Sequence, residues 1–326
     1  MYKRKLKHKV NNAIVNAKHW IKRNTVANHG IVITSKQRRI YQEVTGYYIP
    51  TLLQNGMVSE AINYAKWLCK VQQPSGAWLS FDLKSESIFN TGQVLRGLVA
   101  IYDLLPEVKN NMLRGADWLI SYISTDGRLA PVEGTTFIEG VNSELIHVYC
   151  LPPLCEISQK TGIKIYKEYA KRSLKYYKRT FWTDIINFNY LSHFYAYVIE
   201  AMADLGENKI AEAAMKKIKK IQRVDGSVPA YKNVHWVCST GLLQFAVIWF
   251  KLGYYKEGYK ALKYAISLQN KSGGWYGGYA PHKLDILSNL MREQITYFPN
   301  EEISWAVKYF FDAIYYKEKL ENELKN

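Results

Sequence analysis

The chain has 326 residues, of which 48% are hydrophobic, and it contains 9 Pro and 20 Gly. This composition excludes a disordered or fibrous chain and is sufficient for a large buried core. The formal net charge of +16 leaves an acidic glycan, an anionic membrane and nucleic acid open as partners. Because Lys also covers solvated helix faces, the charge alone does not choose among them.

The first nine residues, MYKRKLKHK, hold five basic side chains but lack the apolar stretch of a secretory signal. No apolar run approaches the roughly 18 residues of a membrane span, so we expect no transmembrane segment and only weak contact of this basic start with anionic lipid. The four cysteines lie in apolar stretches without metal-ligand spacing: Cys69, Cys150, Cys155 and Cys238. We therefore predict reduced thiols, a cytoplasmic protein, no metal and no other cofactor.

In chain order, amphipathic and fully apolar helical patterns alternate. A basic amphipathic stretch comes first, at 3–24. Five pairs follow, each an aromatic-rich apolar segment and then a segment with Lys and Glu on one side. The pairs are predicted at 41–57 and 59–72, 87–105 and 107–123, 142–162 and 164–182, 189–206 and 208–222, and 234–253 and 255–269. A last apolar segment at 301–320 has no successor, and the stretch 3–24 would be its partner.

A seven-residue pattern recurs where the amphipathic segments end. QQPSGAW at 72–78 and QNKSGGW at 269–275 share Gln-x-x-x-Gly-x-Trp, and QRVDGSV at 222–228 keeps the Gln and the Gly. Weaker copies around Gly30 and Gly127 complete a period of about fifty residues. Because Gly commonly terminates helices, we interpret the pattern as a clasp that ends one outer helix and ties it to the next.

The alternation predicts two concentric rings of helices. The predicted fold class is all-α: an (α/α)6 toroid of six inner and six outer helices, forming a single domain over 1–326 that the N-terminal helix, about 3–24, closes. A linear helical solenoid is the alternative. It would need polar caps at both ends, and it accounts less well for helices that are apolar on all sides.

The Gln-x-x-x-Gly-x-Trp pattern resembles the QW repeat of triterpene cyclases. The period resembles the terpenoid cyclase and protein prenyltransferase superfamily of α/α toroids along essentially the whole chain. The catalytic motifs of those families are absent from this chain. It has no Asp-x-Asp-Asp string for cyclisation and no Cys-His-Gly motif for zinc. Trp236 stands before Cys238 where a zinc-binding Asp is expected. The resemblance therefore implies the toroid without isoprenoid cyclisation or zinc.

Four segments carry a second resemblance: YQEVTGYYIPTLL, FNTGQVLRGL, LSHFYAYVIEAMADLG and EEISWAVKYFFDAI. They are similar to α/α-toroid proteins encoded among bacterial surface-polysaccharide genes, and more broadly to toroid lyases, hydrolases and uronyl epimerases, over about 40–315. The third inner helix departs from that pattern, since ELIHVYC stands where an aromatic residue and an Arg are frequent. The resemblance implies a carbohydrate-active protein whose partner is an anionic cell-surface polysaccharide or oligosaccharide.

Polar and aromatic residues open the inner helices, whose starts converge on one mouth of a toroid. We predict four catalytic residues, with His193 as proton acceptor, Tyr47 as proton donor, and Glu43 and Tyr197 beside them. Further substrate-binding residues are predicted at Asn90, Gln93, Asn142, Glu144, His147, Tyr190, His235, Trp236, Glu302 and Trp305. Trp and Tyr faces stack on sugar rings while polar groups bind hydroxyls. A capping or packed core residue is the ordinary explanation for any one of them alone.

Two chemistries fit these residue types. A lyase or epimerase needs a base, an acid and a group that neutralises a uronate carboxylate, which His193, Tyr47 and either Asn90 or Asn142 would supply. A glycoside hydrolase needs two carboxylates, and the candidates are Glu43, Glu144 and Glu302. The rich His, Tyr and Asn set, together with the basic charge, favours the lyase or epimerase.

Two alternatives to an enzyme remain at this stage. The same toroid would serve as a glycan-binding or assembly protein, or as a scaffold for a partner protein. Nucleic-acid binding is not predicted, because it needs Lys and Arg along a groove with aromatic residues between them, and most basic residues here fall on outer helices.

Overall fold

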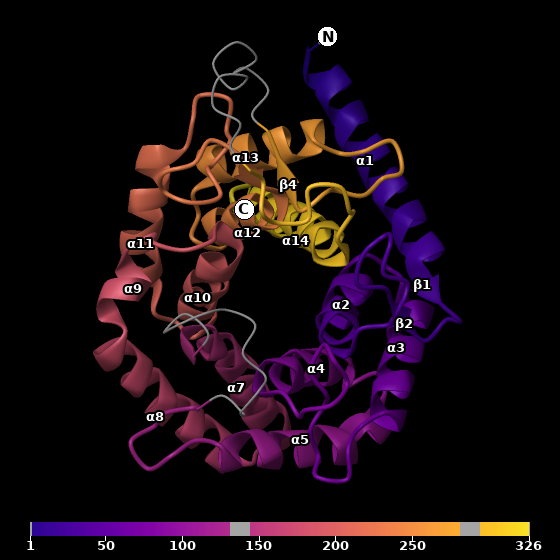
Figure 1. The fold of residues 1–326 in the computed structure, drawn as a ribbon, viewed down its shortest axis with the longest axis vertical. Helices are drawn as coiled ribbons and strands as arrows, with labels where there is room; N and C mark the ends of the chain where they lie inside the picture. Colours follow the sequence, from indigo (N-terminus) through magenta and orange to yellow (C-terminus); the bar gives the residue numbers. More distant parts are fainter. Residues whose placement is uncertain (1, 131–143, 281–293, 326) are drawn as a thin grey trace.

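The computed structural model describes residues 2–130, 144–280 and 294–325, with side chains from His8 onward. Figure 1 shows a ring in which an inner circle of helices is surrounded by an outer one. The chain passes from an inner to an outer helix and back as it proceeds around the ring. This arrangement confirms the prediction of an all-α, (α/α)6 toroid.

The described inner helices are α2 (Gln42–Gln54), α4 (Ile88–Ile101), α7 (Leu151–Thr161), α10 (Ser192–Asp204), α12 (Ser239–Lys251) and α14 (Ser304–Glu323). The described outer helices are α1 (Tyr2–Asn24), α3 (Val58–Lys70), α5 (Lys109–Ser121), α8 (Lys164–Thr180), α11 (Asn208–Ile221) and α13 (Tyr255–Ser267), with the short α9 (Trp182–Ile186) between α8 and α11. Two 3-10 helices, η1 (Pro106–Val108) and η2 (Ile146–Cys150), precede α5 and α7. Two antiparallel strand pairs join β1 (Thr25–Val26) to β2 (Gly30–Ile31) and β3 (Val237–Cys238) to β4 (Gly278–Tyr279).

The burial of the two rings follows their sequence patterns. In the inner helix α12, every residue from Ser239 to Phe250 is buried. In the outer helix α11, the buried residues recur at helical spacing on one side: Ile210, Ala211, Ala214, Met215 and Ile218. The lysines of α11 occupy the opposite, solvated side, so its amphipathic sequence matches its place in the outer ring. None of the described helices combines the length and apolarity required to cross a membrane.

The first clasp joins α3 to α5. The Gln72 side chain donates from Nε2 to the carbonyl of Gly76, at 2.8 Å, and to the carbonyl of Asn111, at 2.9 Å. Gly76 has a φ of 107°, and a Cβ there would lie 2.5 Å from the carbonyl oxygen of Arg114. Only glycine fits this turn, because both the backbone conformation and the close approach to α5 exclude a side chain.

The same contacts recur in the other two clasps. Gln222 donates to the carbonyl of Glu257 and so joins α11 to α13. Gln269 donates to the carbonyl of Ala13, 3.0 Å away, and so joins α13 to α1. These hydrogen bonds confirm the clasp interpretation. They also explain how α1 takes its place in the outer ring between α13 and α3 (Figure 1).

Further along the inner helices, beyond their first turns, charged side chains form ion pairs whose members are buried or partly buried, except for the exposed Asp204. The charged residues of this interior network are Arg96, Glu200, Asp204, Lys251, Lys308 and Asp312. Lys251 lies 2.9 Å from a Glu200 oxygen and 2.6 Å from an Asp204 oxygen. Each carboxylate of the network therefore has a cation beside it, as buried charges require.

Candidate functional site

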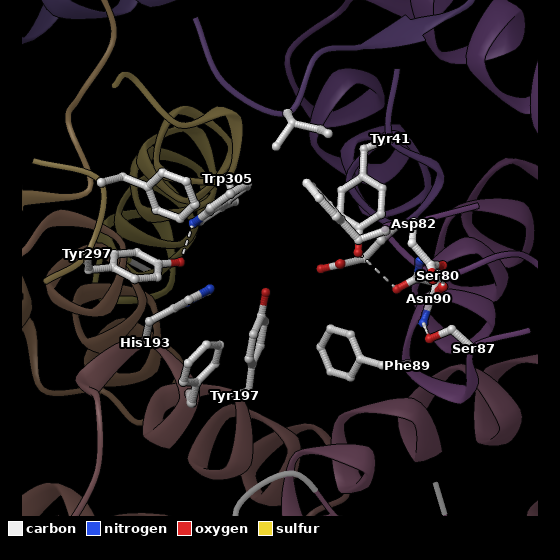
Figure 2. Close-up of a pocket in the computed structure, with 15 residues that line it drawn as sticks. Tyr41, Ser80, Asp82, Ser87, Phe89, Asn90, His193, Tyr197, Tyr297 and Trp305 are labelled. Atoms are coloured by element: carbon white, nitrogen blue, oxygen red, sulfur yellow. Dashed lines mark hydrogen bonds between the residues drawn. The ribbon is translucent and has the colours of Figure 1, made fainter. Parts of the chain in front are cut away.

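A cavity of about 390 Å³ lies where four of the inner helices begin. Its lining comes from the starts of α2, α4, α10 and α14, from the loop before α4 and from the loop before α14 (Figure 2). Aromatic residues dominate this lining: Tyr41, Phe81, Phe89, Phe194, Tyr197, Tyr297, Phe298 and Trp305. Such a concave aromatic surface with a few polar groups is the usual form of a small-molecule site.

Five of the predicted site residues line this cavity, namely Glu43, Asn90, His193, Tyr197 and Trp305. They come from four different helices, which shows why a comparison of helix starts could find residues far apart in sequence. Tyr47 is one turn further along α2 than Glu43 and is fully buried, with its ring 6.4 Å from that of Tyr309. Tyr47 therefore lies beneath the cavity and is not part of its lining.

Glu43 is a buried carboxyl group with an unusual pKa. Only 8% of the residue is exposed, and burial raises its pKa to about 7, although the interaction with the neighbouring Tyr41 hydroxyl opposes the shift. Burial disfavours the charged carboxylate, and no cation among the described residues offsets that effect. At neutral pH a substantial fraction of Glu43 therefore carries a proton that it can donate.

Asp82 is the second carboxyl group of the cavity, and it was not among the predicted residues. It lies in the loop between the first clasp and α4, where the Ser80 hydroxyl donates to its Oδ1 and the backbone N–H of Lys84 donates to the same oxygen at 3.0 Å. These hydrogen bonds hold the pKa of Asp82 below its ordinary value, so the group is ionised at neutral pH. The Ser-x-Asp turn was the signal available in the sequence.

His193 lies on the opposite side of the cavity from Asp82 (Figure 2). Its Nδ1 is 2.7 Å from the amide oxygen of Gln244, which can only accept, so Nδ1 carries the proton and Nε2 is an acceptor. Burial lowers the pKa of His193 to about 3, and the ring stays neutral. Such a ring is a weak base, and this geometry suits a hydrogen-bond acceptor better than the predicted proton acceptor.

Asn90 connects two elements of the cavity wall. Its Oδ1 accepts a hydrogen bond from the Tyr41 hydroxyl at 3.3 Å, and its Nδ2 donates to the carbonyl of Leu79 at 2.6 Å. Both ends of the amide are thus engaged with the protein. Asn90 positions the loop that carries Asp82, and the predicted role of binding a substrate carboxylate is not supported by these contacts.

Three predicted residues near the third inner helix lie away from the cavity. His147 is buried with Nδ1 at 3.2 Å from the carbonyl of Leu129, and burial lowers its pKa to about 4. Glu144 accepts two hydrogen bonds from Arg128, at 2.8 and 3.0 Å. Gln93 points to the sulfur of Cys150 at 3.9 Å. The structure does not bring these three into the shared cavity, and each makes a hydrogen bond to a protein group outside it.

Three more of the predicted residues lie outside the cavity. Tyr190 is buried with its ring 5.5 Å from that of Tyr195. Trp236 is buried against Tyr231, at 5.9 Å between ring centroids, and His235 beside it is exposed. All three precede a helix as expected, but their side chains pack against neighbouring loops or face solvent, and none lines the cavity.

Glu302 lies in a clasp and not in the cavity. Its carboxylate accepts hydrogen bonds from Trp20 Nε1 at 2.7 Å, from Asn270 Nδ2 at 2.9 Å and from the Ser272 hydroxyl. It therefore belongs to the clasp between α13 and α1, and it does not line the cavity as predicted. The remaining predicted residue, Asn142, lies outside the described residues.

No metal-binding cluster of three or more His, Cys, Asp or Glu side chains occurs within 2–130, 144–280 and 294–325.

No known protein family and no curated protein matches the chain by sequence. Solved structures match it by fold. An unsaturated glucuronyl hydrolase specific for heparin has a TM-score of 0.69 and 12% identity, covering 97% of this chain and 98% of its own. An unsaturated glucuronyl hydrolase from Bacillus sp. GL1 has a TM-score of 0.67 and 10% identity, with 95% and 96% covered. The type II terpene cyclase MstE from Scytonema has a TM-score of 0.65 and 15% identity, with 98% and 100% covered.

These likenesses define the class of fold. The chain has the α/α-toroid architecture that glucuronyl hydrolases, other glycosidases and terpene cyclases share. The resemblance inferred from the repeats and helix starts is confirmed at this level. The activity has to be argued from the cavity, since one fold carries several chemistries.

Proposed function

We propose that the protein is a carbohydrate-active enzyme of the glycoside hydrolase type, which takes a sugar of an oligosaccharide or polysaccharide into the cavity. One observation carries this proposal: Glu43 and Asp82 line the same cavity, and their pKa values are shifted in opposite directions. Hydrolysis of a glycosidic bond needs one protonated and one ionised carboxyl group. The glucuronyl hydrolases and glycosidases among the structures of similar fold support the same class.

The two groups have separate roles in the proposed reaction. Protonated Glu43 gives its proton to the glycosidic oxygen as the bond from that oxygen to the anomeric carbon breaks. A water molecule adds to the anomeric carbon, and ionised Asp82 accepts the proton that the water releases. The aromatic walls place their electron-rich faces near the positive charge that develops on the sugar.

The lyase-type alternative has less support in the cavity. It requires a base, an acid and a group that neutralises a uronate carboxylate, which were predicted as His193, Tyr47 and Asn90 or Asn142. The pKa of about 3 makes His193 a weak base. Tyr47 lies beneath the cavity, and the side-chain amide of Asn90 is engaged at both ends.

A non-catalytic glycan-binding or assembly protein would use the same cavity without cleaving the sugar. The pKa of Glu43 favours the enzyme, because stacking on aromatic rings does not need a carboxyl group that retains its proton near pH 7.

Isoprenoid cyclisation is the second candidate, favoured by one specific observation. A protonated carboxyl group within eight aromatic side chains suits protonation of an alkene and stabilisation of the resulting cation. Asp82 and His193 make the cavity more polar than that reaction requires, which places it second.

The test is a substrate screen with the purified protein. Oligosaccharides with neutral, amino and uronate sugars are incubated with the protein, and new reducing ends, unsaturated products and unchanged sugar are measured separately, together with one geranylgeranyl substrate. We expect new reducing ends without unsaturation, and their loss in the Glu43→Gln variant. Unsaturated products would establish a lyase, cyclised isoprenoid would establish the second candidate, and binding without cleavage would establish a binding protein.

A further inference from the structure

Acceptor groups face the cavity on both of its sides. Asp82 is an exposed carboxylate whose Oδ1 accepts from the Ser80 hydroxyl and from the backbone N–H of Lys84. On the other side, His193 offers Nε2. Figure 2 shows Asp82 on one side of the cavity and His193 with Tyr297 on the other. A ligand that carries a donor group between them faces the Asp82 carboxylate on one side and His193 Nε2 on the other.

The walls of the cavity also attract positive charge. Eight aromatic side chains line it, and they come from all four helices and from both loops. The face of an aromatic ring carries partial negative charge and binds an ammonium group within about 6 Å of its centre. Aromatic rings beside an ionised carboxylate form the type of site that binds organic cations.

Cations lie near the cavity without lining it, among them Lys84, whose positive charge contributes to the lowered pKa of Asp82. The guanidinium of Arg39 lies 4.9 Å from the centre of the Phe81 ring and donates to the Phe81 carbonyl. Lys308 lies 2.6 Å from an Asp312 oxygen and 3.8 Å from the centre of the Tyr309 ring. Among the described lining residues there is no Lys and no Arg. A uronate carboxylate in the cavity would lose its hydration without gaining a cationic partner, which is costly.

We infer that the sugar held in this cavity carries a protonated amine, which lies between the Asp82 carboxylate and the aromatic faces. This inference rests on the proposed function, and it names the substrate class of the same site. It differs from the anionic substrate that the net charge of the chain suggested, because that charge is spread over the outer helices while the cavity itself is lined by carboxyl groups.

Binding of methyl glycosides that differ in one substituent tests the inference. Calorimetry on the full chain would compare methyl glucosaminide with its N-acetyl form, with methyl glucoside and with methyl glucuronide, below the pKa of the amine. We expect the amine to bind about tenfold more tightly than the N-acetyl form and the glucuronide to bind most weakly. Added salt should reduce the preference, since screening weakens an interaction between opposite charges.

The chain offers a matched pair of variants. Asp126 sits in the same turn as Asp82, accepting from the Ser124 hydroxyl and from the backbone N–H of Arg128, but it lies outside the cavity. Each substitution removes the carboxylate that accepts the hydrogen bonds of its turn. Asp82→Asn should remove most of the preference for the amine, whereas Asp126→Asn should leave that preference intact.

Three outcomes are decisive against the inference. Equal binding of the amine and the N-acetyl form, tightest binding of the glucuronide, or a preference that survives Asp82→Asn would each overturn it and leave the proposed function standing. Failure of every glycoside to bind would overturn the proposed function as well.

Discussion

Two glutamates on the inner ring, Glu43 at the cavity and Glu200 in the interior network, have opposite pKa shifts. They are similarly buried, at 8% and 3% exposure. Burial raises the pKa of Glu43 to about 7. Burial acts on Glu200 in the same direction, but Lys251, Lys308 and Arg96 outweigh it and hold the pKa of Glu200 below its ordinary value.

The difference distinguishes carboxyl groups that stabilise the ring from the one that is proposed to react. In the interior network each carboxylate has a cation beside it, and the ion pairs of Arg96 and Lys251 with the acidic residues of α10 join inner helices. At the cavity, Glu43 has hydroxyl groups and aromatic rings around it, so its proton is retained near pH 7 and can be transferred. A buried carboxyl group without a cation beside it therefore points to the candidate site in this protein.

The largest expected effect is that of Glu43→Gln on turnover. Loss of the proton donor should reduce kcat by about two to four orders of magnitude. The melting temperature should not fall, because the amide removes a carboxyl group that burial already disfavours. Reducing-end assays on the screened substrate, with thermal unfolding of the same preparation, give both readouts.

Glu302→Gln is the matched control for that variant. It changes another buried glutamate at the start of an inner helix, but one that Trp20, Asn270 and Ser272 bind in a clasp. We expect a loss of stability of about 1–3 kcal/mol, because charged acceptors are lost, with an unchanged kcat. If Glu302→Gln abolished turnover while Glu43→Gln did not, the assignment of the two regions would be reversed.

The interior network should respond in stability alone. Lys251→Met leaves Glu200 and Asp204 without their shared ammonium group, at a cost of about 3–5 kcal/mol for a broken buried pair. Urea unfolding measures this cost, and kcat per folded molecule should match the parent. A variant that kept its stability but lost turnover would mean that the network takes part in the reaction.

The clasps should behave like the interior network. Trp78 and Trp275 are fully buried, and each donates from its indole nitrogen to a carbonyl of the preceding outer helix, Leu68 and Ala265 respectively. Trp78→Ala and Trp275→Ala should each lower the free energy of unfolding by about 3–5 kcal/mol. Activity should fall only in proportion to the unfolded fraction. Full stability with lost activity in either variant would contradict the clasp interpretation.

The fold could be predicted because its signals are local and repeated. Each copy of Gln-x-x-x-Gly-x-Trp marks the end of an outer helix, and the Gly requirement at position 76 follows from contacts that every copy makes. The contrast between α12, buried on all sides, and α11, buried on one, is equally visible in their residues. Repetition of such signals constrains the ring more strongly than any one of them could.

The site was predictable only where helix starts determine it. Glu43 and His193 were found because they open inner helices. Asp82 and Tyr297 were missed because they lie in loops, whose path depends on contacts such as the bond from Asn90 to the carbonyl of Leu79. Glu302 was misassigned because its sequence position does not reveal that its carboxylate turns toward the clasp donors.

The smallest expected effect concerns pH. The contributions of Glu43 and Glu200 to the free energy of unfolding should change with pH in opposite directions. The folded pKa of Glu43 is raised, so its contribution to stability is fully present below its ordinary pKa of about 4.5 and is lost as pH rises through about 7. The folded pKa of Glu200 is lowered, so its contribution is present above the ordinary value and is lost as pH falls below it.

Urea titrations of Glu43→Gln and Glu200→Gln between pH 5 and pH 8 would show the two signs. The stability of Glu43→Gln relative to the parent should improve as pH rises through about 7, by about 1–3 kcal/mol. Glu200→Gln should be less stable than the parent throughout this range, because its amide cannot replace the carboxylate beside Lys251. Parallel pH curves for Glu43→Gln and the parent would show that Glu43 is ionised like an ordinary carboxyl group. The cavity would then lack the protonated acid on which the proposed hydrolysis depends.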